Sequence, residues 1–193
     1  RARHAGEKAE YSSWTDGGFG QMGSFRTVVF GAESSPLQNG GFETVRELDG
    51  VRAESFLFGG WETGNAPVLA ASGWSLHEAH PGKITIVTDD VHSGKNACRL
   101  EEGWIFNFFS AVTGEKLGIE FWAKGQGAVN AMLFQYEEND EGKLKNVPTL
   151  VLGKNQLSNQ WTKYRFEQTI TTPDVKKIAL AFAADGELIL DDV

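Results

Sequence analysis

Residues 117–124 read LGIEFWAK, and the alternation in this stretch decides the fold class. Apolar side chains occupy its odd positions, whereas its even positions hold Gly118, Glu120, Trp122 and Lys124. A period of two residues is typical of a half-buried β-strand, because successive side chains of a strand point to opposite faces. We therefore expect a strand whose odd positions lie in the core and whose even positions form the polar side.

Similar runs fall on both sides of this stretch and carry the same signal. Strands are predicted at residues 84–87, 98–100, 129–136, 161–170, 178–183 and 188–193. Turn chemistry separates them, at 88–95, 125–127, 139–142 and 185–186. No stretch sustains a helical period, so the residues alone predict an all-β antiparallel sandwich or barrel.

Length and charge limit the function classes. The chain has 193 residues with 18 Lys+Arg against 26 Asp+Glu, a formal net charge of −8. A nucleic-acid partner is not expected, because a phosphate-binding surface needs a basic stripe. No membrane partner is expected either, since no apolar run approaches the roughly 20 residues that span a bilayer. Cys98 is the only cysteine, so stability must come from packing or a metal.

The domain prediction places a boundary near Pro36. Residues 1–36 are read as an N-terminal extension or the tail of an upstream domain, and residues 37–193 as the sandwich. The glycine pattern at 18–23 resembles a dinucleotide motif but lacks a strand before it and a helix after it, which favours a flexible segment. His77 and His80 stand three apart rather than four, which favours a solvated loop over a metal pair.

Oxygen-bearing side chains stand at both ends of the predicted sandwich. Glu43 follows Gly40-Gly41-Phe42, and Asp191-Asp192 closes the chain. The first and last strands of an antiparallel sandwich often lie side by side, so these carboxylates and nearby turn carbonyls could bind Ca²⁺. The alternative is that Asp191 accepts hydrogen bonds from backbone amides.

Trp122 raises a second question, because it shares its face with Glu120 and Lys124. An exposed strand tryptophan beside polar groups suits a pyranose ring, whose C–H face stacks on the indole. The alternative is that Trp122 is covered, by the opening segment or by residues 49–73. Tyr164 and Phe166 alternate with Lys163 and Arg165 and are expected in the core.

Six short motifs in order then suggest a family. Together they resemble carbohydrate-binding modules of the family 4, 9, 16 and 22 group over residues 37–193: NGGFE (39–43), SGW (72–74), HSGK (92–95), IEFWAK (119–124), QWTKY (160–164) and ILDDV (189–193). The resemblance implies a galactose-binding-like jelly roll that binds a polysaccharide or oligosaccharide without cleaving it. It also implies a secreted or cell-surface accessory module, covalently linked to further domains of a glycoside hydrolase.

The resemblance carries two sets of site residues. A structural Ca²⁺ is implied at Glu43, Asp191 and the carbonyls of Gly41 and Lys95. The sugar site is implied on a concave sheet. The rings expected to stack on the sugar are Trp104, Trp122 and Tyr136. The side chains expected to orient its hydroxyl groups are Asn107, Glu120, Gln135 and Arg165. The alternation along residues 130–136 does not decide which face Tyr136 is on, so this side chain is expected either in the core or as a platform for the sugar.

Two other functions compete with this one. A structural or adhesive sandwich domain of a cell-surface protein would keep the calcium and lack the glycan site. An enzyme is the least favoured, since no carboxylate pair stands out. The long stretch between Glu43 and Trp74, with Phe56, Phe58 and Trp61, departs from the family pattern and could wall the cleft or block it.

Overall fold

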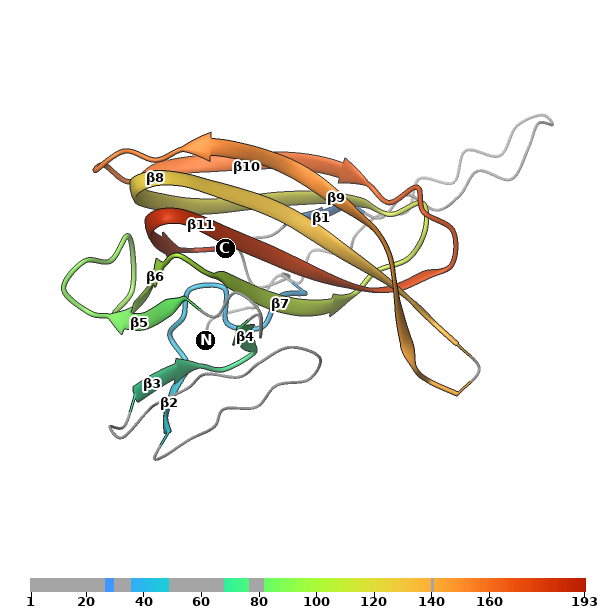
Figure 1. Cartoon of the computed structure of the whole chain (residues 1–193), viewed down its shortest axis with the longest axis horizontal. Coiled ribbons are helices and arrows are strands. Elements are labelled where there is room, and N and C mark those ends of the chain that lie inside the picture. The colour runs from blue at the N-terminus through green and yellow to red at the C-terminus, as the bar shows by residue number, and fades with distance from the viewer. Residues whose placement is uncertain (1–26, 30–35, 49–67, 77–81, 140) are drawn as a thin grey trace, which may run out of the picture.

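The computed structural model describes residues 27–29, 36–48, 68–76, 82–139 and 141–193. All regular structure in these residues is β, so the all-β prediction is confirmed (Figure 1). The strands are β1 (Thr27–Val29), β2 (Val45–Leu48), β3 (Val68–Ala71), β4 (Trp74–Leu76), β5 (Lys83–Val87), β6 (Ala97–Glu101), β7 (Trp104–Ser110), β8 (Lys116–Glu138), β9 (Leu144–Gln156), β10 (Thr162–Thr169) and β11 (Val175–Asp191). The described part contains no helix long and apolar enough to cross a bilayer.

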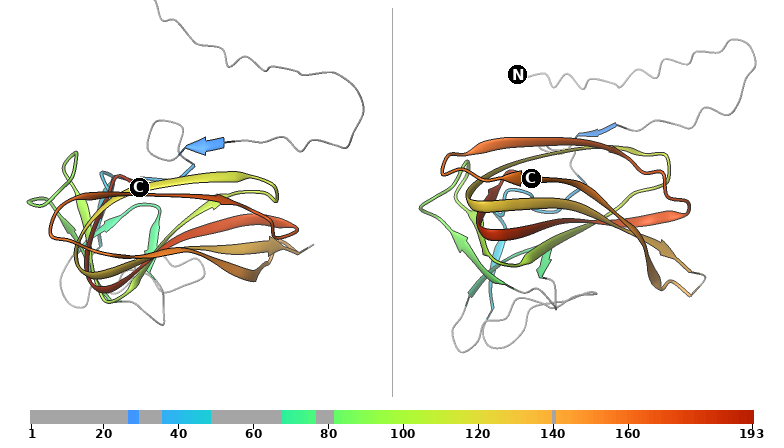
Figure 2. Two further views of the ribbon diagram at one scale, coloured as in Figure 1. Left: turned by 90° about the horizontal axis from the view of Figure 1, so that it is seen from above. Right: turned by 45° about the horizontal axis from the view of Figure 1, so that its top comes forward.

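Nine strands belong to one sheet that curls into the two layers of a sandwich (Figures 1 and 2). The first layer contains β10, the N-terminal half of β8, the C-terminal part of β11, β6 and β5. The second layer contains β9, the C-terminal half of β8, the N-terminal part of β11, β7 and β4. These pairs are antiparallel, as expected, and β2 and β3 form a separate two-stranded sheet.

Two long strands, β8 and β11, run through both layers, which corrects the sequence prediction of four shorter strands separated by turns. The glycines read as turns instead let two backbones approach closely while each strand continues. Gly127 and Gly186 are paired in register and have φ of 89° and 105°. A Cβ on Gly127 would lie 1.8 Å from the carbonyl oxygen of Asp185, so no other residue fits there without movement.

The main core lies between the two layers and is built from the alternate residues that the sequence pattern places inside. Phe121 stacks on Tyr164 with ring centroids 5.2 Å apart and meets Phe182 edge-on at 4.7 Å. Cys98 is fully buried in this core, and burial raises the pKa of its thiol well above the usual range. A buried neutral thiol of this kind is chemically inert in the folded protein.

The N-terminal extension contributes one described strand. β1 pairs in parallel with residues 116–118 of β8. The same residues of β8 also pair with β10, in the antiparallel direction. The boundary at residue 36 stays a prediction. The glycine motif at 18–23, the histidines at 77 and 80 and the stretch 49–67 lie outside the described residues.

Candidate functional site

The face of the second layer that points away from the main core carries two rows of aromatic rings; we call it the aromatic face. β7 contributes Trp104, Phe106 and Phe108, and β8 contributes Phe134 and Tyr136. The central strand β11 lies between these rows and places the small side chains of Ala179, Ala181 and Ala183 there. Because side chains of one face recur at every second residue, the alternation of β7 and β11 alone determines this arrangement.

The rings of the aromatic face pack against one another. Phe106 meets Phe134 edge-on with centroids 5.3 Å apart, and Trp104 lies 6.0 Å from Phe134. Phe106 is fully buried, whereas Trp104, Phe108 and Phe134 are half-buried. The rings at the rim of the face are therefore less buried than Phe106 at its centre.

Tyr136 extends the aromatic face toward the β8–β9 hairpin. Its ring lies 6.1 Å from Phe108, and the Nζ of Lys177 stands 5.7 Å over that phenylalanine. Tyr136 is 3% exposed, and burial raises the pKa of its hydroxyl to about 12. Among the described residues this hydroxyl has no hydrogen-bond partner, which is a costly state for a buried polar group.

Asn107 and Gln135 do not lie on the aromatic face, which corrects their expected position as exposed sugar contacts. Both are fully buried, on the opposite side of β7 and β8, toward the main core. Asn107 Nδ2 donates to the carbonyl of Gln38 at 2.7 Å, and Gln135 Nε2 donates to the carbonyl of Pro148 at 2.5 Å. These bonds hold a loop and a strand in place.

Trp122, Glu120 and Arg165 lie on the outer face of the first layer, the other side of the sandwich. Glu120 accepts an ion pair from Lys163 at 2.6 Å and a longer one from Arg165 at 3.5 Å. Trp122 is half-buried, and the ring of His92 stacks on it with centroids 3.9 Å apart. The predicted sugar contacts therefore fall into three places, and only Trp104 and Tyr136 share the aromatic face.

Two of the predicted calcium residues, Glu43 and Asp191, contact one loop, residues 88–96 between β5 and β6, and this loop contains a third, Lys95. Glu43 Oε1 accepts from the backbone N–H of Lys95 at 2.8 Å and of Asn96 at 3.2 Å. Gly94 has φ of 63°, and a Cβ there would lie 2.0 Å from Glu43 Oε1. Glycine at this position therefore lets the turn pass directly over the carboxylate.

Asp191 reaches the same loop from the end of β11. Its Oδ2 accepts from the backbone N–H of His92 at 2.9 Å and of Ser93 at 3.1 Å, and its Oδ1 accepts from Asp192 at 2.8 Å. Asp191 is fully buried, and this burial raises the pKa of its carboxyl to about 6 against the lowering effect of the amide donors. These contacts are the ones that the alternative to a calcium ligand predicted, in which Asp191 accepts hydrogen bonds from backbone amides.

The donor set fits a hard cation such as Ca²⁺, which prefers carboxylate and carbonyl oxygens. Glu43 and Asp191 contact neighbouring residues of one loop, and Val193 N donates to the carbonyl of Gly40 at 3.2 Å, which brings the chain end to residues 40–43. In the described part of the chain, no three Asp, Glu, His or Cys side chains are grouped closely enough to hold a metal. A cation here would depend on main-chain oxygens, as the expected carbonyls of Gly41 and Lys95 would supply.

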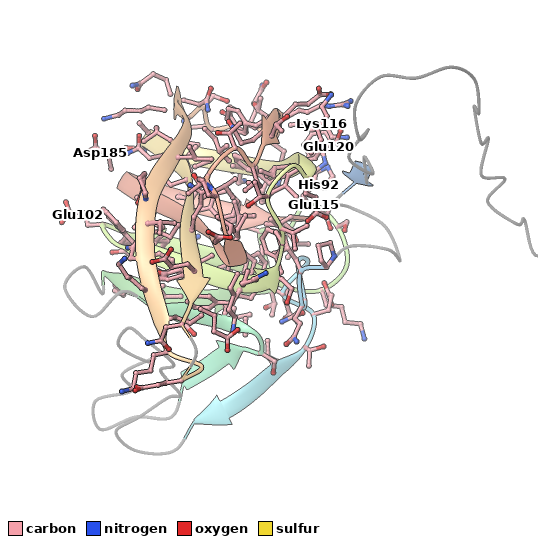
Figure 3. The ribbon with its side chains drawn as sticks, turned by 90° about the vertical axis from the view of Figure 1, so that its right-hand side faces the viewer. His92, Glu102, Glu115, Lys116, Glu120 and Asp185 are labelled. Carbon is pink, nitrogen blue, oxygen red and sulfur yellow. The ribbon has the colours of Figure 1, made fainter. Side chains whose placement is uncertain are left out.

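Sequence reasoning missed the side chains that surround these carboxylates. His92 Nδ1 lies 2.6 Å from Asp192 Oδ2, and Ser93 Oγ donates to Asp192 Oδ1 at 2.8 Å. The motif HSGK contained both residues, but nothing in the sequence indicates that they meet the chain end about a hundred residues later. Figure 3 shows His92 and Glu120 at one end of the molecule and Glu102 and Asp185 at the other.

A shallow depression of about 450 Å³ lies at that second end. Charged residues and glycines line it: Gly82, Lys83, Glu101, Glu102, Gly186 and Glu187. Lys83 and Glu101 form an ion pair at 2.9 Å across its wall. None of the predicted ligand or metal residues lines this depression.

No protein-family model matches the sequence, and no curated protein aligns with it. Solved structures similar to this chain include carbohydrate-binding modules. A CBM22-2 xylan-binding domain from Paenibacillus barcinonensis matches with a TM-score of 0.48 and 13% identity, over 64% of this chain and 90% of that one. The CBM22-1–GH10 modules of a Clostridium thermocellum endo-1,4-beta-D-xylanase match with a TM-score of 0.49 and 13% identity, over 62% of this chain and 25% of that one.

A family 11 carbohydrate-binding module of a Clostridium thermocellum cellulosomal cellulase matches with a TM-score of 0.41 and 14% identity, over 64% of this chain and 86% of that one. The likeness is one of fold, and the roles of individual residues rest on the contacts of this chain.

Proposed function

We propose that this chain is a non-catalytic carbohydrate-binding module whose polysaccharide or oligosaccharide ligand stacks on the aromatic face. The observation that carries the proposal is the pair of aromatic rows on β7 and β8, separated by alanines on β11. Half-buried rings at the rim, Trp104, Phe108 and Phe134, offer flat apolar surface to the C–H face of a pyranose.

Polar groups beside these rings supply the hydrogen bonds that orient a sugar. Asn130 lies on the same side of β8 as Phe134 and is half-buried, and Lys177 stands over Phe108. Stacking on a few rim rings gives weak binding, so we expect dissociation constants from micromolar to millimolar, about −4 to −8 kcal/mol.

Calcium is the second part of the proposal. Glu43 and Asp191, with the carbonyls of Gly41 and Lys95, would hold a structural Ca²⁺ between the first strands, the 88–96 loop and the chain end. The support is the hard-oxygen donor set and the buried carboxylate of Asp191, whose desolvation a cation would offset. Bound calcium would neutralise Asp191 and fix the loop, and it has no part in ligand contact.

The biological setting follows from the sequence motifs and belongs to the same proposal. We place the module in a secreted or cell-surface protein, joined covalently to further domains such as a glycoside hydrolase. Its own role is to hold a glycan near those domains.

The test is a binding screen against a glycan panel that includes xylan and β-glucans, in calcium, by affinity gel and calorimetry. Trp104→Ala should abolish binding, because it removes the largest rim ring. The matched control is Trp161→Ala on the other side of the sandwich, which should bind as the wild type does. Binding that survives Trp104→Ala unchanged would remove the aromatic face as the site.

A second candidate function has its own support. Phe106, Tyr136 and the β11 alanines are buried, and His92 covers one side of Trp122. A structural or adhesive domain of a cell-surface protein needs no open glycan site and would show this burial. A folded, calcium-loaded protein that binds no glycan of the panel would favour this second function.

A further inference from the structure

Three rings form a cluster on the outer face of the first layer, beside the 88–96 loop. His92 stacks on Trp122 with centroids 3.9 Å apart and planes inclined by 15°, and it meets Trp161 edge-on at 5.6 Å. Lys124 stands over Trp161 at 5.3 Å and pairs with Asp90 at 2.5 Å. Strand β8 and Trp161, the residue before β10, thus contact this loop through aromatic rings and an ion pair.

The imidazole of His92 connects this ring cluster to the chain end. Its Nδ1 lies 2.6 Å from Asp192 Oδ2, and because a carboxylate can only accept, Nδ1 is the donor. Ser93 Oγ donates to the other oxygen of Asp192 at 2.8 Å. Asp192 is therefore engaged on both oxygens by side chains of the loop.

The backbone of the same two residues binds the neighbouring carboxylate. His92 N and Ser93 N donate to Asp191, which is paired in register with Trp122 across β11 and β8. A movement of the loop backbone that withdraws the His92 ring from Trp122 would also displace the amides that contact Asp191. Ring stacking and the contacts to Asp191 are thus linked through the loop backbone.

We infer that Trp122 and His92 are positioning residues of the calcium site: by clamping the 88–96 loop onto the sheet they hold this loop against Glu43 and Asp191. This inference rests on the calcium site proposed above. A loop already ordered before the cation arrives loses less conformational entropy on binding, which raises affinity. Trp122, predicted as a sugar platform, acts in this account on the metal and not on the glycan.

The experiment measures cation affinity in two ways, by calorimetry with Ca²⁺ and by luminescence of Tb³⁺, which replaces calcium at oxygen sites and is sensitised by a nearby indole. His92→Ala and Trp122→Leu should each weaken Ca²⁺ binding about 10-fold or more, the usual effect of losing a residue that orients a ligand. Trp122→Leu should in addition lower the Tb³⁺ signal, and Trp161, the second indole of the cluster, would sensitise what remains. Trp104→Leu, a tryptophan change on the opposite layer, should leave both readouts unchanged.

Two further measurements separate positioning from a general loss of structure. Thermal melting in chelator shows whether each variant folds, and His92→Phe keeps a stacking ring without the bond to Asp192. We expect His92→Phe to lie between wild type and His92→Ala in Ca²⁺ affinity. At saturating calcium, Trp122→Leu should bind glycan as the wild type does.

The outcomes distinguish this inference from the proposals beneath it. Wild-type Ca²⁺ affinity in both His92→Ala and Trp122→Leu would overturn the positioning role and leave the calcium site standing. Absence of Ca²⁺ and Tb³⁺ binding in the wild type would overturn both. Loss of glycan binding in calcium-saturated Trp122→Leu, equal to that of Trp104→Leu, would make Trp122 a sugar contact and refute the inference.

Discussion

The close approach of β8 and β11 at Gly127 can be tested against a control with the same backbone angle. Gly127 has φ of 89° and Gly114 has φ of 90°, but a Cβ on Gly127 would lie 1.8 Å from Asp185 O, whereas nothing stands within 4 Å of the corresponding atom on Gly114. Gly114→Ala and Gly127→Ala therefore share the cost of positive φ, about 1–2 kcal/mol. Only Gly127→Ala adds a collision with backbone.

The added cost follows from the movement that the collision requires. Real Cβ contacts essentially never fall under 3.0 Å, so the Asp185 carbonyl must shift by about 1.2 Å. This shift disrupts the ladder hydrogen bonds beside the Gly127–Gly186 pair, each worth about 1 kcal/mol. We expect Gly127→Ala to lose about 3 kcal/mol more than Gly114→Ala.

The assay is thermal and urea unfolding of both variants, followed by circular dichroism. For a domain of this size about 1 kcal/mol corresponds to 2–4 °C, so Gly127→Ala should melt about 6–12 °C below Gly114→Ala. Melting temperatures within about 2 °C of each other would refute the steric reasoning, because they would mean that β8 and β11 can move apart at Gly127 without cost.

Three further predictions concern buried polar groups. Cys98 should react with a thiol reagent only after unfolding, since burial raises its pKa and closes access; reaction in native buffer at neutral pH would contradict its burial. Tyr136→Phe should be neutral or stabilising at pH 7, because it removes an unpartnered hydroxyl. The wild type should also lose stability between about pH 10 and 12, where the unfolded tyrosine ionises and the folded one does not, and a denaturant series that shows the same loss in Tyr136→Phe would exclude this cause. Asn107→Ala should cost about 1–3 kcal/mol in urea unfolding, because the bond to the Gln38 carbonyl is lost, and should leave glycan binding unchanged at saturation; loss of binding in a folded variant would restore Asn107 as a contact.

The sequence predicted the faces of single strands well, because alternation is a local property. Phe121 and Tyr164 lie in the core and Trp122 and Glu120 lie on the polar side, as their positions indicate. Strand ends were less predictable. The Gly127 and Gly186 positions have the chemistry of turns, and only the partner strand, distant in sequence, shows that they are crossings.

β9 was missed altogether, because Pro148 and polar residues interrupt any alternation along residues 144–156. It forms as a strand since β8 pairs with it, in a register interrupted by irregularities. The candidate site likewise contains residues that the sequence could place and contacts that it could not. The carboxylates Glu43 and Asp191 could be placed from their positions at the two ends of the domain, but the covering of Trp122 by His92 depends on the path of a loop.

The two shared strands determine how this domain should come apart. One part of β8 and one part of β11 belong to each layer, so neither layer is a sheet made only of its own strands. Partial unfolding of one layer would have to break strands that also belong to the other, so amide exchange in both should report a single global opening. Their pairing also joins residues far apart in sequence, which predicts slow folding through one high barrier. A force that pulls on the two ends of the domain should therefore unfold it in one cooperative step rather than one layer after the other.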